Sequence, residues 1–135
     1  MLTRLCYVST ATRQMREAEL SELLRVSRRN NESAGITGLM LYCTGNFMQY
    51  LEGPEVAIDQ LWGKILQDRR HHGAIEMFRQ PAHERVFDSW SMGFGTTSAS
   101  QFEELLQVAR ARANPAGDTS GRVVELMRAF WKDNR

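Results

Sequence analysis

The stretch GITGLMLYCTGNFMQYLEGP, residues 35–54, decides the fold. Two apolar runs flank Thr44-Gly45, and glycine tolerates the positive φ that a tight hairpin turn requires. We therefore predict a β-hairpin. Side chains alternate between the faces of a strand, so Phe47, Gln49 and Leu51 should share one face. The Gln49 amide would then lie between two large apolar neighbours, where unmade hydrogen bonds cost roughly 1–3 kcal/mol.

Helical patterns stand on both sides of this hairpin. Apolar residues at helical spacing predict a helix over 17–31, ended by Gly35. Downstream, Gly53 and Pro54 open a second helix over 55–69, with proline preset for the first turn and Gly73 expected as the C-cap. Alternating apolar stretches predict further strands over residues 2–9, 74–81 and 85–94.

This order of elements is the split βαβ pattern of a ferredoxin-like fold. We expect an α+β class with a five-stranded mixed sheet and two helices on one face. The tail carries two more amphipathic segments, 100–113 and 122–132, which we expect to cover the other face as C-terminal helices. The predicted division is a domain over 1–97 and a helical extension over 98–135 packed on the sheet.

Composition excludes several classes of function. The 135 residues suit one domain, and 17 basic against 16 acidic residues give no overall steering toward nucleic acid or anionic lipid. No apolar run approaches the ~18 residues of a membrane span, and the first residues have too short an apolar run for a signal peptide and lack a cleavage-like site. Cys6 and Cys43 lack a metal-like spacing and should be reduced thiols. We predict a cytoplasmic protein with no metal, nucleic-acid or membrane partner.

Several polar residues fall on faces that should be apolar. Tyr7, Gln49, Trp90 and Met92 lie on strands, and Asn31 lies on the inner face of the first helix. Each alone has an ordinary structural explanation, such as a core tyrosine with a bonded hydroxyl or an asparagine capping a helix end. Their convergence favours a pocket instead. Phenol and amide groups bond both donors and acceptors, so the pocket suits a planar heteroaromatic ligand edged with carbonyls and ring nitrogens.

Five motifs, taken together, resemble the BLUF family of blue-light sensors that use flavin. They are RLCYVS, NNESAGITGLMLY, NFMQYLEG, ILQDRRHH and FDSWSMGF, which follow one another within roughly residues 2–95. The resemblance implies non-covalently bound FAD, although the isolated fold often accepts shorter flavins.

The resemblance also implies roles for individual residues. Tyr7 matches the tyrosine that gives an electron and a proton to the excited flavin, and Gln49 matches the glutamine between that tyrosine and the N5/C4 carbonyl edge. Asn31 matches the asparagine that contacts the C4 carbonyl and N3. The other implied cofactor contacts are Asn30, Lys64, Asp68, Arg70 and His71, and the implied signalling positions are Ser9, Trp90 and Met92.

The expected function is a blue-light photoreceptor that is not an enzyme and signals to a separate partner protein. A homo-oligomer is expected, because arginine supplies 15 of the 17 basic residues and the tail stripe carries Phe130 and Trp131. Two alternatives are a flavin- or nucleotide-dependent enzyme and a light-insensitive ferredoxin-like adaptor. The first lacks paired carboxylates near the pocket and a general acid–base set, and the intact Tyr7, Asn31 and Gln49 argue against the second.

Overall fold

The computed structural model describes residues 2–12, 15–43, 45–85, 93–96 and 100. The elements are β1 (Leu2–Ala11), α1 (Glu17–Ala34), β2 (Thr37–Cys43), β3 (Asn46–Pro54), α2 (Glu55–Gln67), β4 (His71–Ala82) and β5 (Gly93–Thr96). The predicted α+β class is confirmed. The predicted tail helices, 100–113 and 122–132, lie outside the described residues apart from Ser100.

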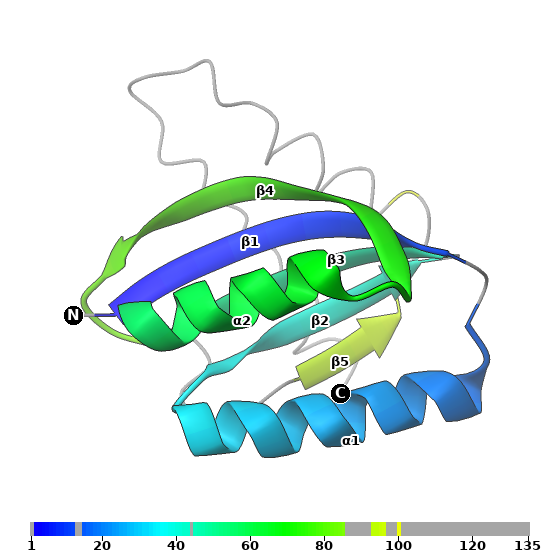
Figure 1. Ribbon diagram of the computed structural model, residues 1–135, viewed down its shortest axis with the longest axis horizontal. Helices are drawn as coiled ribbons and strands as arrows, with labels where there is room; N and C mark the ends of the chain where they lie inside the picture. Colours follow the sequence, from blue (N-terminus) through cyan, green and yellow to red (C-terminus); the bar gives the residue numbers. More distant parts are fainter. Residues whose placement is uncertain (1, 13–14, 44, 86–92, 97–99, 101–135) are drawn as a thin grey trace.

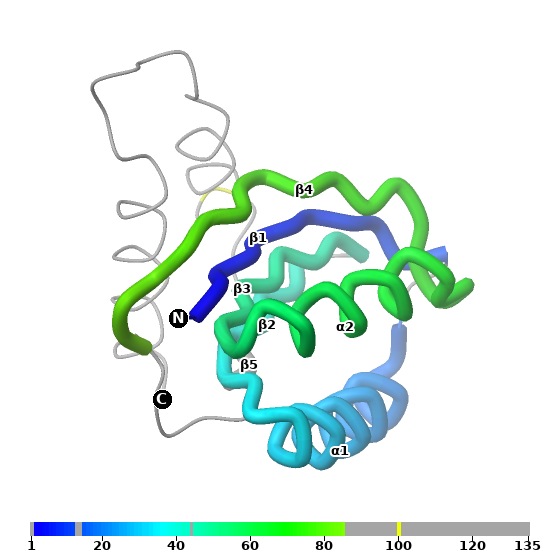
Figure 2. The backbone as a smooth tube through the Cα atoms, turned by 60° about the vertical axis from the view of Figure 1, so that its left-hand side comes forward, coloured from blue at the N-terminus to red at the C-terminus, as the bar shows by residue number. Residues whose placement is uncertain are grey.

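The strands form one sheet in the order β4-β1-β3-β2-β5, and both helices lie on the same side of it (Figures 1 and 2). Neighbouring strands are antiparallel except β2 and β5, which are parallel. The long strands β1 and β4 curve over α2, while α1 lies toward β2 and β5. The space between the two helices therefore opens directly onto the central strands β1 and β3.

The hairpin forms as predicted. Cys43 pairs with Asn46 at the end of the β2–β3 ladder, and Gly45 in the turn has φ 91°. The stop of α1 is also confirmed: Gly35 has φ 72°, and its N–H reaches back to the carbonyls of Asn31 and Glu32. A left-handed glycine after the last helical residue satisfies carbonyl groups that the helix leaves unpaired.

The predicted end of the second helix is wrong. α2 stops at Gln67 with Asp68 as its C-cap, and Gly73, at φ 63°, belongs to β4. His71 and His72 pair with the end of β1 instead, so sheet hydrogen bonds replace the last helical turn. Pro54 occupies the N-cap of α2 rather than its first turn.

Both faces of the sheet are buried. The face beneath the helices carries an apolar cluster that includes Leu5, Leu51, Leu24 of α1 and Ile58 of α2. On the opposite face Leu39, Leu41, Met48 and Tyr50 are also fully buried. Cys6 and Cys43 are buried and not in disulfides, and burial raises the pKa of the Cys6 thiol to about 12. Within the described part of the chain, no helix is long and apolar enough to cross a membrane.

Candidate functional site

A cavity of about 250 Å³ lies between the two helices and the sheet. Its walls come from β1, β2, β3, α1, α2 and the turn between α2 and β4. The structure brings most of the predicted site residues together in this lining: Tyr7, Ser9, Asn30, Asn31, Gln49, Lys64, Asp68, Arg70 and His71. Trp90 and Met92 lie outside the described residues.

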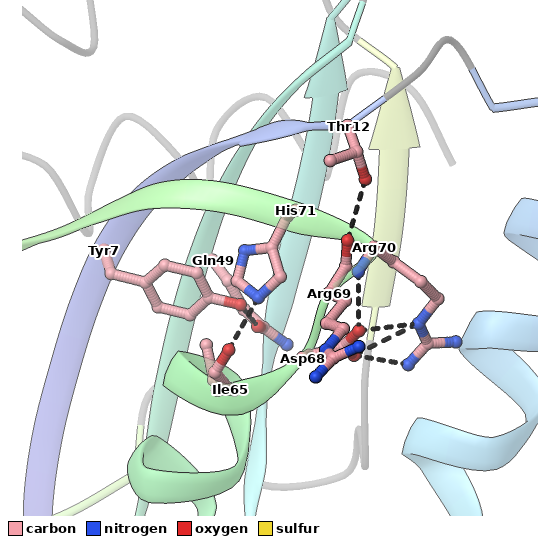
Figure 3. A network of polar contacts seen from close by, with 8 residues as sticks. All are labelled: Tyr7, Thr12, Gln49, Ile65, Asp68, Arg69, Arg70 and His71. Atoms are coloured by element: carbon pink, nitrogen blue, oxygen red, sulfur yellow. Dashed lines mark hydrogen bonds and ion pairs between the residues drawn. The ribbon is translucent and has the colours of Figure 1, made fainter.

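Gln49 is held by Tyr7 at the floor of the cavity. The two residues are cross-strand partners on β1 and β3, and the Tyr7 hydroxyl donates to Gln49 Oε1 (Figure 3). Both side chains are 4% exposed. An amide accepts through its oxygen and donates through its nitrogen, so Gln49 can bond the phenol and the edge of a ligand together.

Burial controls the ionisation of the Tyr7 phenol. Loss of solvent raises its pKa well above the ordinary value, and the nearby Cys6 and Asp68 raise it further. The phenol therefore keeps its proton at neutral pH. Its ring packs against Trp62, with centroids 5.1 Å apart and planes tilted by 54°. Trp62 thus fixes the ring from the α2 side.

Ser9 contributes a buried hydroxyl group to the cavity lining. Its side chain is 4% exposed, and its hydroxyl has no hydrogen-bond partner among the described residues. A buried polar group left unsatisfied costs roughly 1–3 kcal/mol. A ligand with a polar edge would satisfy it, so the residues present fit a planar, hydrogen-bonding group.

The last turns of α1 supply amide groups from the other wall. Asn31 is 3% exposed, whereas Asn30 is exposed at its own position. The Asn31 backbone carbonyl accepts the N–H of Ile36 at 2.8 Å, which fixes the turn that carries its side chain. The Asn31 amide is therefore presented to the cavity from a rigid helix end.

The turn from α2 into β4 closes one end of the cavity (Figure 3). Asp68 accepts the Arg70 guanidinium at 2.5 Å and the Arg70 backbone N–H at 2.9 Å. Arg70 holds the pKa of the Asp68 carboxyl below its usual range, mainly through the side-chain hydrogen bond. His71 Nε2 donates to the Ile65 carbonyl at 2.7 Å, and Thr12 Oγ1 donates to the Arg69 carbonyl at 2.9 Å. These bonds lock the turn to α2 and to the end of β1.

A second cavity of about 300 Å³ adjoins this turn. It shares Met15, Asp68 and Arg70 with the first cavity and adds Arg69. Elsewhere in the described residues there is no group of three or more His, Cys, Asp or Glu side chains that could hold a metal ion.

The family whose members are described as sensors of blue-light using FAD, BLUF, matches residues 2–93. This chain belongs to the BLUF family. Its two-helix α+β fold is the fold of the BLUF family.

Individual relatives support this membership. The photoactivated adenylate cyclase subunit beta of Euglena longa is 42% identical over 106 residues, which is 78% of this chain and 12% of the relative. The BLUF protein BlrB, solved in its dark state, is 30% identical with a TM-score of 0.74, covering 98% of this chain and 96% of that one. Klebsiella pneumoniae BlrP1, solved with FMN and cyclic diGMP, is 28% identical with a TM-score of 0.70, covering 98% and 35%. The match spans about an eighth of the cyclase's length.

Sequence reasoning missed the apolar part of this BLUF cavity. Its walls include Leu23, Val26, Met40, Phe47 and Leu61. Their spacing on helices and strands signalled a core, and spacing cannot tell a core position from a ligand wall. Trp62 was missed for the same reason, because it belongs to the apolar stripe of α2. Ligand pockets are commonly apolar with a few polar groups, which is what this mixture provides.

Proposed function

We propose that this protein is a blue-light photoreceptor in which FAD lies in the cavity between α1 and α2, and in which Tyr7 and Gln49 carry the photochemistry. The observation that carries the proposal is the Tyr7–Gln49 hydrogen bond at the floor of that cavity. The unpartnered hydroxyl of Ser9 and the buried amide of Asn31 support it.

Bound flavin would supply absorption of blue light and an excited ring that accepts an electron. Tyr7 would be the donor of that electron, and its oxidised phenol, a much stronger acid, would release its proton through the bonded Gln49 amide. Both the electron and the proton return to Tyr7 at the end of the cycle. The covalent structure of the flavin would be unchanged at the end of the cycle. What differs is the hydrogen bonding of Gln49, which settles in another rotamer or tautomer.

The remaining predicted site residues surround this pair. Asn31 would bond the C4 carbonyl and N3 edge of the flavin, with Asn30 beside it, and Lys64 would hold the pyrimidine edge. Asp68, Arg70 and His71 hold the cavity end. A cavity of about 250 Å³ is small for a pocket, since ligand sites typically measure roughly 300–1,000 Å³. We infer that it takes the flavin ring and that the phosphate-bearing tail extends toward Arg69 and Arg70 in the adjoining cavity.

FAD is the proposed form of the flavin, because the family description names it. The FMN in the BlrP1 structure shows that a relative of this chain binds a shorter flavin. The test is the absorption spectrum of the purified protein, with chromatography of the flavin released on denaturation. We expect a yellow protein whose spectrum shifts reversibly to the red under blue light. Gln49→Ala should retain flavin without the shift, and a normal shift in that variant would overturn the mechanism.

The output of the sensor is proposed to be a separate protein partner, with this chain acting as a sensor rather than an enzyme. Ser9, Trp90 and Met92 are the proposed signalling residues. Residues 1–97 form the flavin domain in this proposal, and residues 98–135 form a helical extension on the sheet face opposite α1 and α2. The complete burial of Leu41 and Tyr50 on that face supports the need for a cover.

Assembly and location remain predictions. We propose a homo-oligomer in the cytoplasm. Light scattering at high micromolar concentration tests the assembly, and a monomer there would refute it. Capture of a partner from the native cell in light but not in darkness, or the reverse, would identify the output.

A further inference from the structure

One arginine joins three backbone segments at the end of α1 that lies nearest the β3–α2 connection. The Arg85 guanidinium donates from Nη2 to the Gly35 carbonyl at 2.7 Å. It also donates from Nη1 to Thr37 Oγ1 at 3.0 Å and to the Glu52 carbonyl at 3.4 Å. A single side chain thus bonds the C-cap of α1, the start of β2 and the end of β3. Arg85 is not among the described residues that line the cavity.

The backbone is closely packed at this point. We call it the helix-end junction and define it as Gly35, Ile36, Gly53 and Pro54. A Cβ added to Gly53 would lie 3.0 Å from the Gly35 carbonyl oxygen and 3.1 Å from Ile36 Cγ1. Pro54, the next residue, is the N-cap of α2. The end of α1 and the start of α2, the two helices that line the cavity, therefore meet at this junction, and Arg85 bonds to it.

The junction connects directly to the cavity through Asn31. The Asn31 carbonyl accepts the N–H groups of both Gly35 and Ile36, so Asn31 and the C-cap belong to one hydrogen-bonded turn. The Asn31 side chain is buried in the cavity lining. A guanidinium at the carbonyl end of a helix is favoured by the helix dipole. Arg85 therefore holds the end of the turn that aims the Asn31 amide.

We propose that Arg85 is a positioning residue for the cofactor: by clamping the helix-end junction, it fixes the Asn31 amide against the flavin. This inference rests on the proposed function. It predicts that Arg85 affects flavin binding without touching flavin, and that it does so only through Asn31.

A double-mutant cycle tests this route. Dissociation constants for FAD are measured by fluorescence titration of the apoprotein for wild type, Arg85→Gln, Asn31→Ala and the double variant. Arg85→Gln should raise the dissociation constant about three- to tenfold, a coupling typical of residues in one hydrogen-bonded network. In the Asn31→Ala background, Arg85→Gln should have no further effect. An unchanged constant, or two effects that multiply, would overturn the inference.

A spectroscopic readout separates positioning from mere stabilisation. The carbonyl stretching bands of bound flavin report the contact with Asn31. Arg85→Gln should move the same band in the same direction as Asn31→Ala, and Arg85→Lys, which keeps the charge but has a single donor nitrogen, should restore part of the wild-type position. A lowered melting temperature with unmoved bands would show a structural role only and refute the proposal.

Arg79→Gln is the matched control. Arg79 also ties a strand to a helix, because it bonds Glu76 within β4 and Asp59 on α2, but it is not part of the helix-end junction. It should leave the dissociation constant unchanged. If Arg85→Gln does not fold, as judged by circular dichroism, Arg85→Lys takes its place in the cycle, and a wild-type constant for it refutes the inference. Failure of the wild-type chain to bind any flavin would instead refute the proposed function.

Discussion

Gln49 and Tyr50 are neighbours in β3, yet their side chains lie on opposite faces of the sheet and in very different environments. Toward the helices, Gln49 accepts the Tyr7 hydroxyl beside an open cavity. On the far face, the Tyr50 hydroxyl donates to Glu52 Oε2 at 2.9 Å, while Thr37 Oγ1 donates to Glu52 Oε1 at 3.1 Å. On one face a tyrosine hydroxyl donates to a neutral amide, and on the other a tyrosine hydroxyl donates to a carboxylate.

The two tyrosines look alike by the usual signs of a functional residue. Both are buried, and burial is the largest cause of the raised pKa of each phenol. At Tyr50 the charge of Glu52 raises the pKa further, while Arg4, the cross-strand partner of Glu52, lowers it. Glu52 is 0% exposed and bonded through both oxygens. A perturbed pKa therefore does not distinguish the two faces, whereas the cavity beside Tyr7 does.

The largest expected difference is photochemical. Tyr7→Phe should bind flavin and lose the light-induced red shift completely, because the electron and proton donor is gone. Tyr50→Phe removes the same hydroxyl from the other face and should keep a full shift. Lit-minus-dark absorption spectra at matched flavin content decide between them, and loss of the shift in both variants would contradict the division between the faces.

The stability of the fold should depend on the far face, which matters little for the photochemistry. Glu52→Gln replaces an oxygen that accepts a buried hydrogen bond with an amide nitrogen, which leaves the Tyr50 or Thr37 hydroxyl without its acceptor and should lower the free energy of unfolding by roughly 1–3 kcal/mol. Urea denaturation of the apoprotein measures this. The exposed Glu84→Gln is the control and should stay within about 0.5 kcal/mol of wild type. A Glu52→Gln variant as stable as that control would show that the far-face network contributes little.

Binding should separate from switching on the cavity face itself. Asn31→Ala leaves a carbonyl and ring-nitrogen edge of the flavin unpaired, which costs roughly 1–3 kcal/mol. We expect about tenfold weaker binding of FAD, corresponding to 1.4 kcal/mol in that range, with a normal red shift in the fraction that binds. Titration of the apoprotein with FAD measures the binding, and illumination of the same sample then measures the red shift. A variant that binds normally but fails to shift would reverse the roles of Asn31 and Gln49.

The smallest effect is the pH dependence of stability. The folded pKa of Tyr50 lies above its unfolded value of about 10, so the folded state binds more protons between the two values. Its contribution to stability is complete below pH of about 10 and is lost as the pH rises toward the folded value. Urea midpoints from pH 8 to 11 should fall more steeply for wild type than for Tyr50→Phe. Parallel curves would argue against a raised pKa at Tyr50.

Local chemistry made much of this predictable from sequence. The positive φ of Gly35 and Gly45 follows from glycine at a helix end and in a two-residue turn. The alternation of side chains predicted that Phe47, Gln49 and Leu51 share one face of β3, and the structure places all three on the face beneath the helices. These inferences succeed because each depends on neighbours close in the chain.

The rest depends on contacts between distant segments. The end of α2 was misplaced because β1 captures His71 and His72, a pairing that spans most of the domain. The bond from Arg85 to Gly35 joins residues 50 positions apart, so no spacing rule could reveal it. The far-face pairing of Tyr50 with Glu52 has a helpful spacing of two residues, but its importance depends on that face being fully buried.

The tight contact at Gly53 has a consequence for mutational libraries. A side chain there would press on the Gly35 carbonyl and on Ile36, which would have to give by a few tenths of an ångström, although Gly53 is not among the described residues lining the cavity. A library sorted for soluble expression should therefore be depleted at position 53 and tolerant at position 49. The same library sorted for colour change under blue light should be depleted at both. Sorting twice thus divides the eight-residue motif NFMQYLEG into a position needed for folding and a position needed for light sensing.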